Sequence, residues 1–172
     1  VKPIIKSYLE GKFEYRYVKQ EDGEVEKIIS KEAVFYVNSV NNITSIIKRA
    51  GLTPEQVNIL VANTPDNVNK IHKRLGRKFD IGTVPLRDEP RKMFTFCTRT
   101  VYLGADFYSD NARSFVVSDA NIDTLAVDIS LDLPQILGRQ RLIENPWRNE
   151  ATLFFKPIKG ANKKPEEEFN KK

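Results

Sequence analysis

Five short, almost unbroken apolar runs are the feature of this sequence that most constrains its fold. They occupy residues 34–37, 57–61, 93–97, 114–117 and 152–155. Each run is too short for a helix and is rich in β-branched or aromatic residues, which is typical of a strand buried on both faces. Such strands, joined by helices, predict a mainly parallel sheet with right-handed crossovers. We therefore expect an α/β fold with helices on both sides of the sheet.

Three segments between the runs have the pattern of amphipathic helices. The first ends at Gly51 and places four apolar residues on one face, namely Ile43, Ile46, Ile47 and Ala50. The second opens at Pro65 and ends before Gly76, and the third covers residues 134–143, with a proline in its first turn. Proline at a helix start and glycine just beyond its end are ordinary helix boundaries.

The two ends of the chain differ from this pattern. Apolar and charged residues alternate over residues 13–17, and Asp22-Gly23 then predicts a tight turn into a second strand at 25–29. We expect residues 1–30 to be an extension or linker with a β-hairpin, 31–157 to be the α/β domain, and 158–172 to be a flexible polar tail. Tyr15 and Tyr17 of the hairpin either stack on bases or pack within it.

Composition excludes several classes of function. The chain has one cysteine, Cys97, and one histidine, His72, so we expect no disulfide framework, zinc finger or other metal site. No apolar run approaches the roughly 18 residues of a membrane span, and no leader opens the chain, so a cytoplasmic protein without a membrane partner is expected. Val1 in place of methionine favours a piece of a longer polypeptide, although methionine removal gives the same start.

The strand ends hold the residues best suited to chemistry. Ligands of open parallel sheets collect at the carboxyl ends of the strands, and the net charge of +5 permits a polyanionic partner. Three places contain polar groups: Asn38 and Ser39 after the first run, Thr98 after the third, and the predicted helix with Gln135, Gly138, Arg139 and Arg141.

Two of these segments resemble motifs of one enzyme family. Residues 135–141 (Gln-Ile-Leu-Gly-Arg-Gln-Arg) look like the arginine-bearing sixth motif of superfamily 2 helicases, and residues 98–106 (Thr-Arg-Thr-Val-Tyr-Leu-Gly-Ala-Asp) are similar to the fifth. Residues 34–39 resemble the fourth motif, with a less specific pattern. The resemblance covers residues 33–156 and implies the second RecA-like domain of a helicase core, a three-layer α/β/α domain.

The resemblance implies that ATP and Mg²⁺ are held between this domain and a first RecA-like domain. The sequence contains no Gly-x-x-x-x-Gly-Lys-Ser/Thr loop, so the phosphates would be cradled by that other domain. By resemblance, Arg139 and Arg141 supply arginine fingers beside Gln135 and Gly138, and Gly104 and Asp106 face the nucleotide and the domain interface. The spacing favours Arg139 over Arg141. The alternative is an exposed helix face or a salt bridge with Asp132 or Glu144.

A second group of residues is expected to hold nucleic-acid phosphates, which hydroxyls, amides and backbone N–H groups do without reading sequence. By resemblance or by position these are Asn38, Ser39, Thr64, Thr98 and Arg99. The alternative for them is capping of loops and helices, with Thr98 and Asp106 capping a short helix between them. A basic helix side either lies along a duplex or is solvated; it comprises Lys70, Lys73, Arg74, Arg77 and Lys78.

The sequence therefore predicts the carboxyl-terminal motor domain of an ATP-dependent superfamily 2 helicase or translocase. We expect it to act on DNA, with RNA as the alternative, and to be inactive without the N-terminal RecA-like ATPase domain of the same polypeptide. A different class also fits: a nucleic-acid-binding module that keeps the fold without the motor. A third option is the motor part of a restriction or mobile-element complex.

Overall fold

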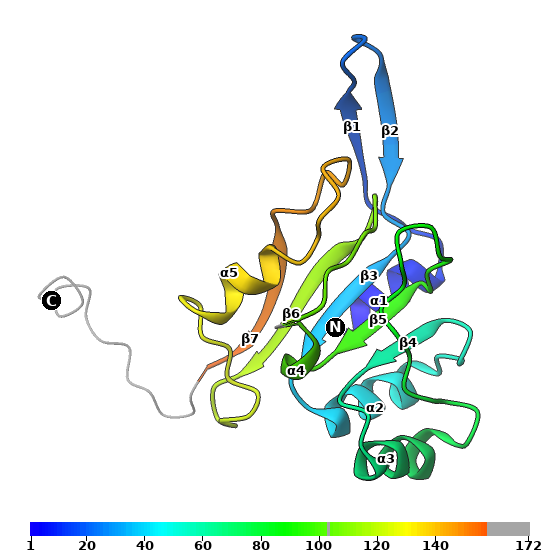
Figure 1. The fold of residues 1–172 in the computed structure, drawn as a ribbon, viewed down its shortest axis with the longest axis vertical. Helices are drawn as coiled ribbons and strands as arrows, with labels where there is room; N and C mark the ends of the chain where they lie inside the picture. Colours follow the sequence, from blue (N-terminus) through cyan, green and yellow to red (C-terminus); the bar gives the residue numbers. More distant parts are fainter. Residues whose placement is uncertain (103, 158–172) are drawn as a thin grey trace, which may run out of the picture.

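Parallel pairing of the apolar runs organises the fold. The computed structural model describes residues 1–102 and 104–157, and within them the five runs form a sheet with the order β4-β5-β3-β6-β7 (Figure 1). All neighbouring strands are parallel, and Ala33 of the central strand pairs with Phe94 on one side and Arg113 on the other. The predicted parallel sheet is confirmed, with strands β3 (Ala33–Val37), β4 (Val57–Leu60), β5 (Phe94–Cys97), β6 (Arg113–Asp119) and β7 (Ala151–Lys156).

Helices cover both faces of this sheet, because side chains alternate between the two faces along each strand. Phe35 of β3 belongs to one apolar cluster and Tyr36 to the other. The first cluster is closed by α1 (Lys2–Leu9), α2 (Val40–Ala50) and α3 (Pro65–Leu75), and the second by α4 (Arg99–Tyr102) and α5 (Asp132–Leu137). The described residues therefore form the expected α/β/α layers, consistent with a RecA-like fold.

The first two predicted helices are confirmed as α2 and α3, and local chemistry sets their ends. The Ser39 hydroxyl accepts a hydrogen bond from the Asn42 amide at 3.2 Å, and the Thr64 hydroxyl accepts one from the Asn67 amide at 3.3 Å. Such N-caps satisfy amides that have no partner inside the helix. Helix α2 ends at Gly51, whose φ of 64° is the left-handed conformation that glycine adopts readily.

The third predicted helix is shorter than expected. Helix α5 ends at Leu137 and not at residue 143. After Gly138 the backbone pairs with residue 107: the Phe107 amide donates to the Arg139 carbonyl at 2.8 Å, and the Arg141 amide donates to the Phe107 carbonyl at 2.9 Å. The Arg139 amide still donates to the Ile136 carbonyl at 3.1 Å in the closing turn, and from Gln140, which forms an isolated parallel bridge with Phe107, the helical bonds are replaced.

The amino-terminal region contains the predicted hairpin and an unpredicted helix. Strands β1 (Tyr15–Lys19) and β2 (Val25–Ile29) pair in antiparallel fashion and project from the sheet as an arm (Figure 1). Helix α1, by contrast, packs into the main core through Ile5 and Tyr8, and the Tyr8 hydroxyl lies 2.8 Å from the Ser30 hydroxyl. The predicted tail, 158–172, lies outside the described residues.

Candidate functional site

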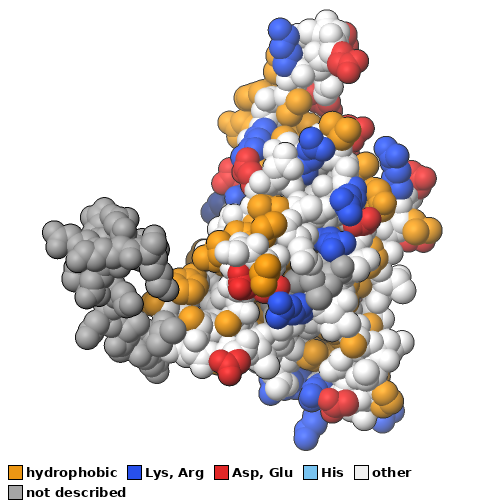
Figure 2. Space-filling view, turned by 60° about the vertical axis from the view of Figure 1, so that its left-hand side comes forward, with side chains coloured by type: hydrophobic (Ala, Val, Ile, Leu, Met, Phe, Trp, Pro, Cys, Tyr) orange, Lys and Arg blue, Asp and Glu red, His pale blue; other side chains and the backbone are white. Residues whose placement is uncertain are grey.

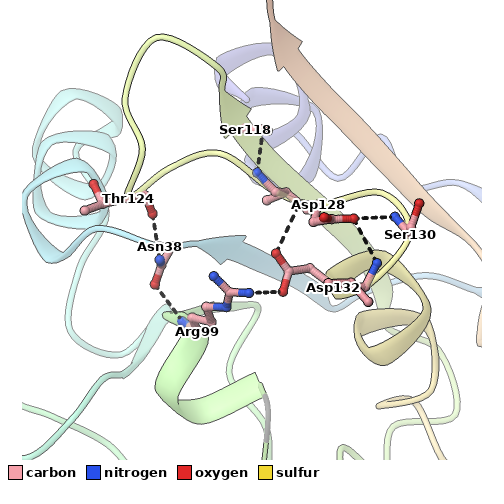
Figure 3. A network of polar contacts seen from close by, with 9 residues as sticks. Asn38, Arg99, Ser118, Thr124, Asp128, Ser130 and Asp132 are labelled. Carbon is pink, nitrogen blue, oxygen red and sulfur yellow. Dashed lines mark hydrogen bonds and ion pairs between the residues drawn. The ribbon is translucent and has the colours of Figure 1, made fainter.

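Parallel pairing brings the predicted strand-end residues together. Asn38 follows β3 and Arg99 follows Thr98 at the end of the neighbouring β5. The Asn38 side-chain oxygen accepts a hydrogen bond from the Arg99 amide at 3.0 Å, and its Nδ2 donates to the Thr124 carbonyl at 2.6 Å (Figure 3). The Asn38 side chain thus joins the ends of two strands to the loop that follows β6.

An ion pair extends this network to the start of α5. The Arg99 guanidinium donates through Nη2 to Asp132 Oδ1 at 2.5 Å, and the second carboxylate oxygen accepts from the Asp128 amide at 3.0 Å (Figure 3). The Asp132 side chain is only 3% exposed, whereas that of Arg99 is 46% exposed. A buried carboxylate requires such partners, so the cation that was predicted to contact nucleic acid also neutralises Asp132.

The loop before α5 is held by further polar contacts that sequence reasoning missed. Asp128 Oδ1 accepts from the amides of Ser130 at 2.7 Å and Leu131 at 3.0 Å, and the Ser118 hydroxyl accepts from the Val127 amide at 3.1 Å (Figure 3). Aspartate often closes turns by accepting from amides two or three residues onward, and Asp128 and Asp132 both precede the predicted helix start at Pro134. That pattern was an available signal for Asp128, whereas the contacts of Asp132 with Arg99 and the Asp128 amide had no such local signal.

Three of the residues predicted to contact nucleic acid make hydrogen bonds within the protein. Ser39 and Thr64 cap α2 and α3, which was the alternative interpretation of both side chains. Thr98 is buried, its amide donates to the Leu60 carbonyl at 3.2 Å, and its carbonyl accepts from the Val101 amide at 3.0 Å. Thr98 thus connects β4 to the first turn of α4 through its backbone.

The two predicted finger arginines meet at one carboxylate. Asp106 Oδ1 lies 2.8 Å from Arg141 Nε and 3.4 Å from Arg139 Nη1. Residues two apart on a helix diverge, but α5 ends before Arg139, and the backbone bonds of residues 139 and 141 to Phe107 leave both side chains within reach of Asp106. The partner is therefore Asp106 and not Asp132 or Glu144, which were the acidic groups expected for a salt bridge.

The two arginines differ in access to solvent. The Arg141 side chain is 48% exposed and that of Arg139 only 16%. Arg139 reaches inward toward Tyr36: burial raises the pKa of the Tyr36 phenol well above its usual value, and the charge of Arg139 opposes that shift. Arg141 is thus the guanidinium that a ligand reaches first, although the motif spacing favoured Arg139.

The other predicted nucleotide-side residues, Gln135, Gly138 and Gly104, are exposed. Gly138 is the C-cap of α5, directly before Arg139. Gly104 lies two residues before Asp106, and a Cβ built on it would meet no atom within 4 Å.

The cysteine and the metal-binding side chain types form no further site among the described residues. The Cys97 thiol is fully buried in β5 and donates to the Phe35 carbonyl at 3.7 Å, and burial strongly raises its pKa. Within residues 1–102 and 104–157, no three His, Cys, Asp or Glu side chains gather where they could hold a metal ion. In the same residues, no helix combines the length and apolar character needed to cross a bilayer.

The fold and the site define a three-layer α/β domain with two polar centres on the described surface. One is the strand-end network of Asn38, Arg99 and Asp132, and the other is the cluster of Asp106, Arg139 and Arg141. Comparison with known proteins adds nothing to this description, since no family model, curated protein or solved structure matches the chain.

Proposed function

We propose that this chain is the C-terminal motor domain of an ATP-dependent superfamily 2 helicase or translocase. One observation carries the proposal: the segments that resemble the fifth and sixth motifs lie side by side. Asp106 and Arg139 are 33 residues apart in sequence, yet the backbones beside them are hydrogen-bonded through Phe107. A motif resemblance gains weight when the fold supplies the context that the motif needs.

The donor set at this cluster fits a phosphate. Guanidinium groups remain charged at any physiological pH and present several N–H groups in one plane, which matches the oxygens of carboxylates and phosphates. Arg141 already donates to a carboxylate oxygen at 2.8 Å. Phosphate oxygens brought to its exposed side would compete with Asp106 for the same N–H groups.

In this proposal Arg141 is the arginine finger, and the more buried Arg139 shares its carboxylate partner Asp106. ATP supplies the phosphoryl group whose transition-state charge the guanidinium stabilises, and a finger of this kind contributes about 10³ to 10⁵ in rate. The phosphate cradle and the Mg²⁺ ligands would belong to an N-terminal RecA-like domain, because this sequence has no phosphate loop. Asp106 would hold Arg141 in place while the two domains are apart.

The strand-end network is assigned to the nucleic acid. The Arg99 side chain is 46% exposed, and it stands with Asn38 at the carboxyl edge of the sheet, where backbone amides and side-chain donors can meet phosphates. The network ties this edge to α5, which leads directly into the arginine segment. A movement of the arginine segment would therefore be transmitted to the residues that contact the nucleic acid. We expect this nucleic acid to be DNA, with RNA as the alternative.

The test is ATP hydrolysis by the natural polypeptide that joins this chain to its N-terminal RecA-like domain. We expect Arg141→Ala to lower the rate by about 10³-fold or more and to leave oligonucleotide affinity largely intact. Arg49→Ala is the matched control, because Arg49 is also exposed but belongs to α2, which covers the opposite face of the sheet from α5. A wild-type rate in Arg141→Ala would exclude the motor and favour a binding module without hydrolysis.

A further inference from the structure

The projecting hairpin exposes an aromatic face that the motor assignment does not use. Tyr15 and Tyr17 are 51% and 66% exposed, and their rings are in edge contact with centroids 5.6 Å apart. Two residues apart on a strand, they point to the same side. Packing within the hairpin, which was one alternative for these tyrosines, does not bury them.

Basic side chains share this face, and acidic ones do not. The register places Lys27 opposite Tyr17 and Lys19 opposite Val25, so both lysines project on the tyrosine side. The Lys27 ammonium lies 4.0 Å from the centre of the Tyr15 ring. Glu26 alternates to the opposite side, where it accepts a hydrogen bond from Gln20 at 2.6 Å.

The opposite side of the hairpin is anchored to the body of the domain. The Arg16 guanidinium donates to both carboxylate oxygens of Glu150, at 2.7 and 2.8 Å, and to the Pro146 carbonyl at 2.7 Å. It also lies over the Trp147 ring, 5.4 Å from its centre. Because these contacts hold the base of the arm, the tyrosine face is presented to solvent in a defined direction.

We propose that this face, composed of Tyr15, Tyr17, Lys19 and Lys27, binds single-stranded nucleic acid. The faces of the tyrosine rings would stack on unpaired bases, and the two lysines would contact the adjacent phosphates. Charge selects this partner: besides the exposed Val25 and Ile29, which the register also places on this side, the two strands present two aromatic rings, two cations and no carboxylate here. Figure 2 shows hydrophobic side chains along the arm, and both a basic and an acidic side chain at its tip.

The platform would be a second contact for the polynucleotide of the proposed function. The hairpin leads into the amino end of β3, whereas Asn38 and Arg99 lie at the carboxyl edge of the sheet (Figure 1). A strand that touched both places would run along the length of the sheet. The inference rests on the proposed function only for the choice of nucleic acid as the ligand. The location and composition of the binding face follow from the geometry of the hairpin.

The experiment measures fluorescence anisotropy of a labelled thymidine oligonucleotide of about 20 nucleotides, titrated with the 172-residue chain. We expect Tyr15→Ala and Tyr17→Ala each to weaken binding about 5- to 150-fold, the loss that corresponds to one stacked base. Tyr17→Trp should retain affinity. Phe155→Ala is the control, because Phe155 is an aromatic side chain of 56% exposure that lies on β7, outside the hairpin.

The contribution of the two lysines is tested by the salt dependence of oligonucleotide affinity. Replacement of Lys19 and Lys27 by glutamine should reduce the slope of log affinity against log salt by about 0.7 for each phosphate that a lysine no longer neutralises. Thermal unfolding should be unchanged in all these variants, because the substituted side chains are exposed.

Three outcomes would overturn the inference: no binding by the wild-type chain, wild-type affinity in the tyrosine variants, or self-association of the chain that disappears in Tyr17→Ala. The last would assign the face to a second copy of the chain. The two proposals fail separately, since Arg141→Ala tests hydrolysis and the tyrosine variants test strand binding.

Discussion

Individual polar residues at the edge of the sheet form hydrogen bonds that stabilise the fold. The Ser39 hydroxyl is the N-cap of α2, and both ends of the Asn38 amide are engaged by backbone groups. The sequence placed these residues correctly at strand ends, but it left open whether their side chains face the protein or a phosphate. The geometry shows the first role, and a ligand would have to share these groups.

Substitution of Ser39 separates the two roles. Ser39→Ala should lower the free energy of unfolding by about 1 kcal/mol, because the Asn42 amide loses its acceptor. Ser39→Asp keeps a capping oxygen and should stay close to wild type in a urea titration, yet its charge should weaken oligonucleotide binding if phosphates lie nearby. An alanine variant as stable as the wild type would show that the cap contributes nothing.

At the scale of helices, glycine marks an end in two different ways. Gly51 stops α2 in a left-handed conformation, with φ of 64°. Gly138 follows α5 with φ of −72°, which is open to any residue, and a Cβ there would make ordinary contacts at 3.6 and 3.7 Å. The end of α2 is therefore determined by the local sequence. The end of α5 follows from the pairing of residues 139–141 with Phe107.

The two glycines should respond differently to alanine. Gly51→Ala should lower the free energy of unfolding by about 1 to 2 kcal/mol, the cost of a left-handed conformation for a residue with a Cβ. Gly138→Ala should change it by no more than about 0.5 kcal/mol. Both values are measured by chemical denaturation. Equal effects at the two positions would contradict the conformational argument, since space is available at both.

For the whole molecule, the amino-terminal helix is part of the core that supports the sheet. Ile5 and Tyr8 are 1% and 2% exposed, and the Tyr8 ring packs against Phe94 of β5 with centroids 5.9 Å apart. Residues 2–9 have no partner nearby in the sequence that would predict this position. Within residues 1–30, therefore, the helix packs into the core whereas the hairpin projects from it (Figure 1).

Two substitutions in α1 test its place in the core. Ile5→Ala should lower the free energy of unfolding by about 2 to 5 kcal/mol, because it leaves a cavity in packed surroundings. Leu9 belongs to the same helix but is 42% exposed, so Leu9→Ala should cost far less. Thermal and urea unfolding of both variants give the comparison. A small effect at Ile5 would mean that α1 can leave the core without loss of the sheet.

The local pattern of the sequence determined the five parallel strands, helices α2 and α3, and the hairpin turn at Gly23. Each depends on neighbouring residues, whose apolar spacing and turn chemistry are readable without the rest of the chain. It also identified which polar residues stand at the strand ends, because a strand's last residue follows from its apolar run.

Only the tertiary structure decided how those residues are paired. It joined Arg99 to Asp132 and both Arg139 and Arg141 to Asp106, ended α5 early, and buried α1. These are contacts between distant segments, and their energy arises from desolvation and hydrogen bonding that exist only after the chain has folded. The same physical reason leaves Tyr15 and Tyr17 exposed: the body of the domain engages the Arg16 side of the hairpin instead.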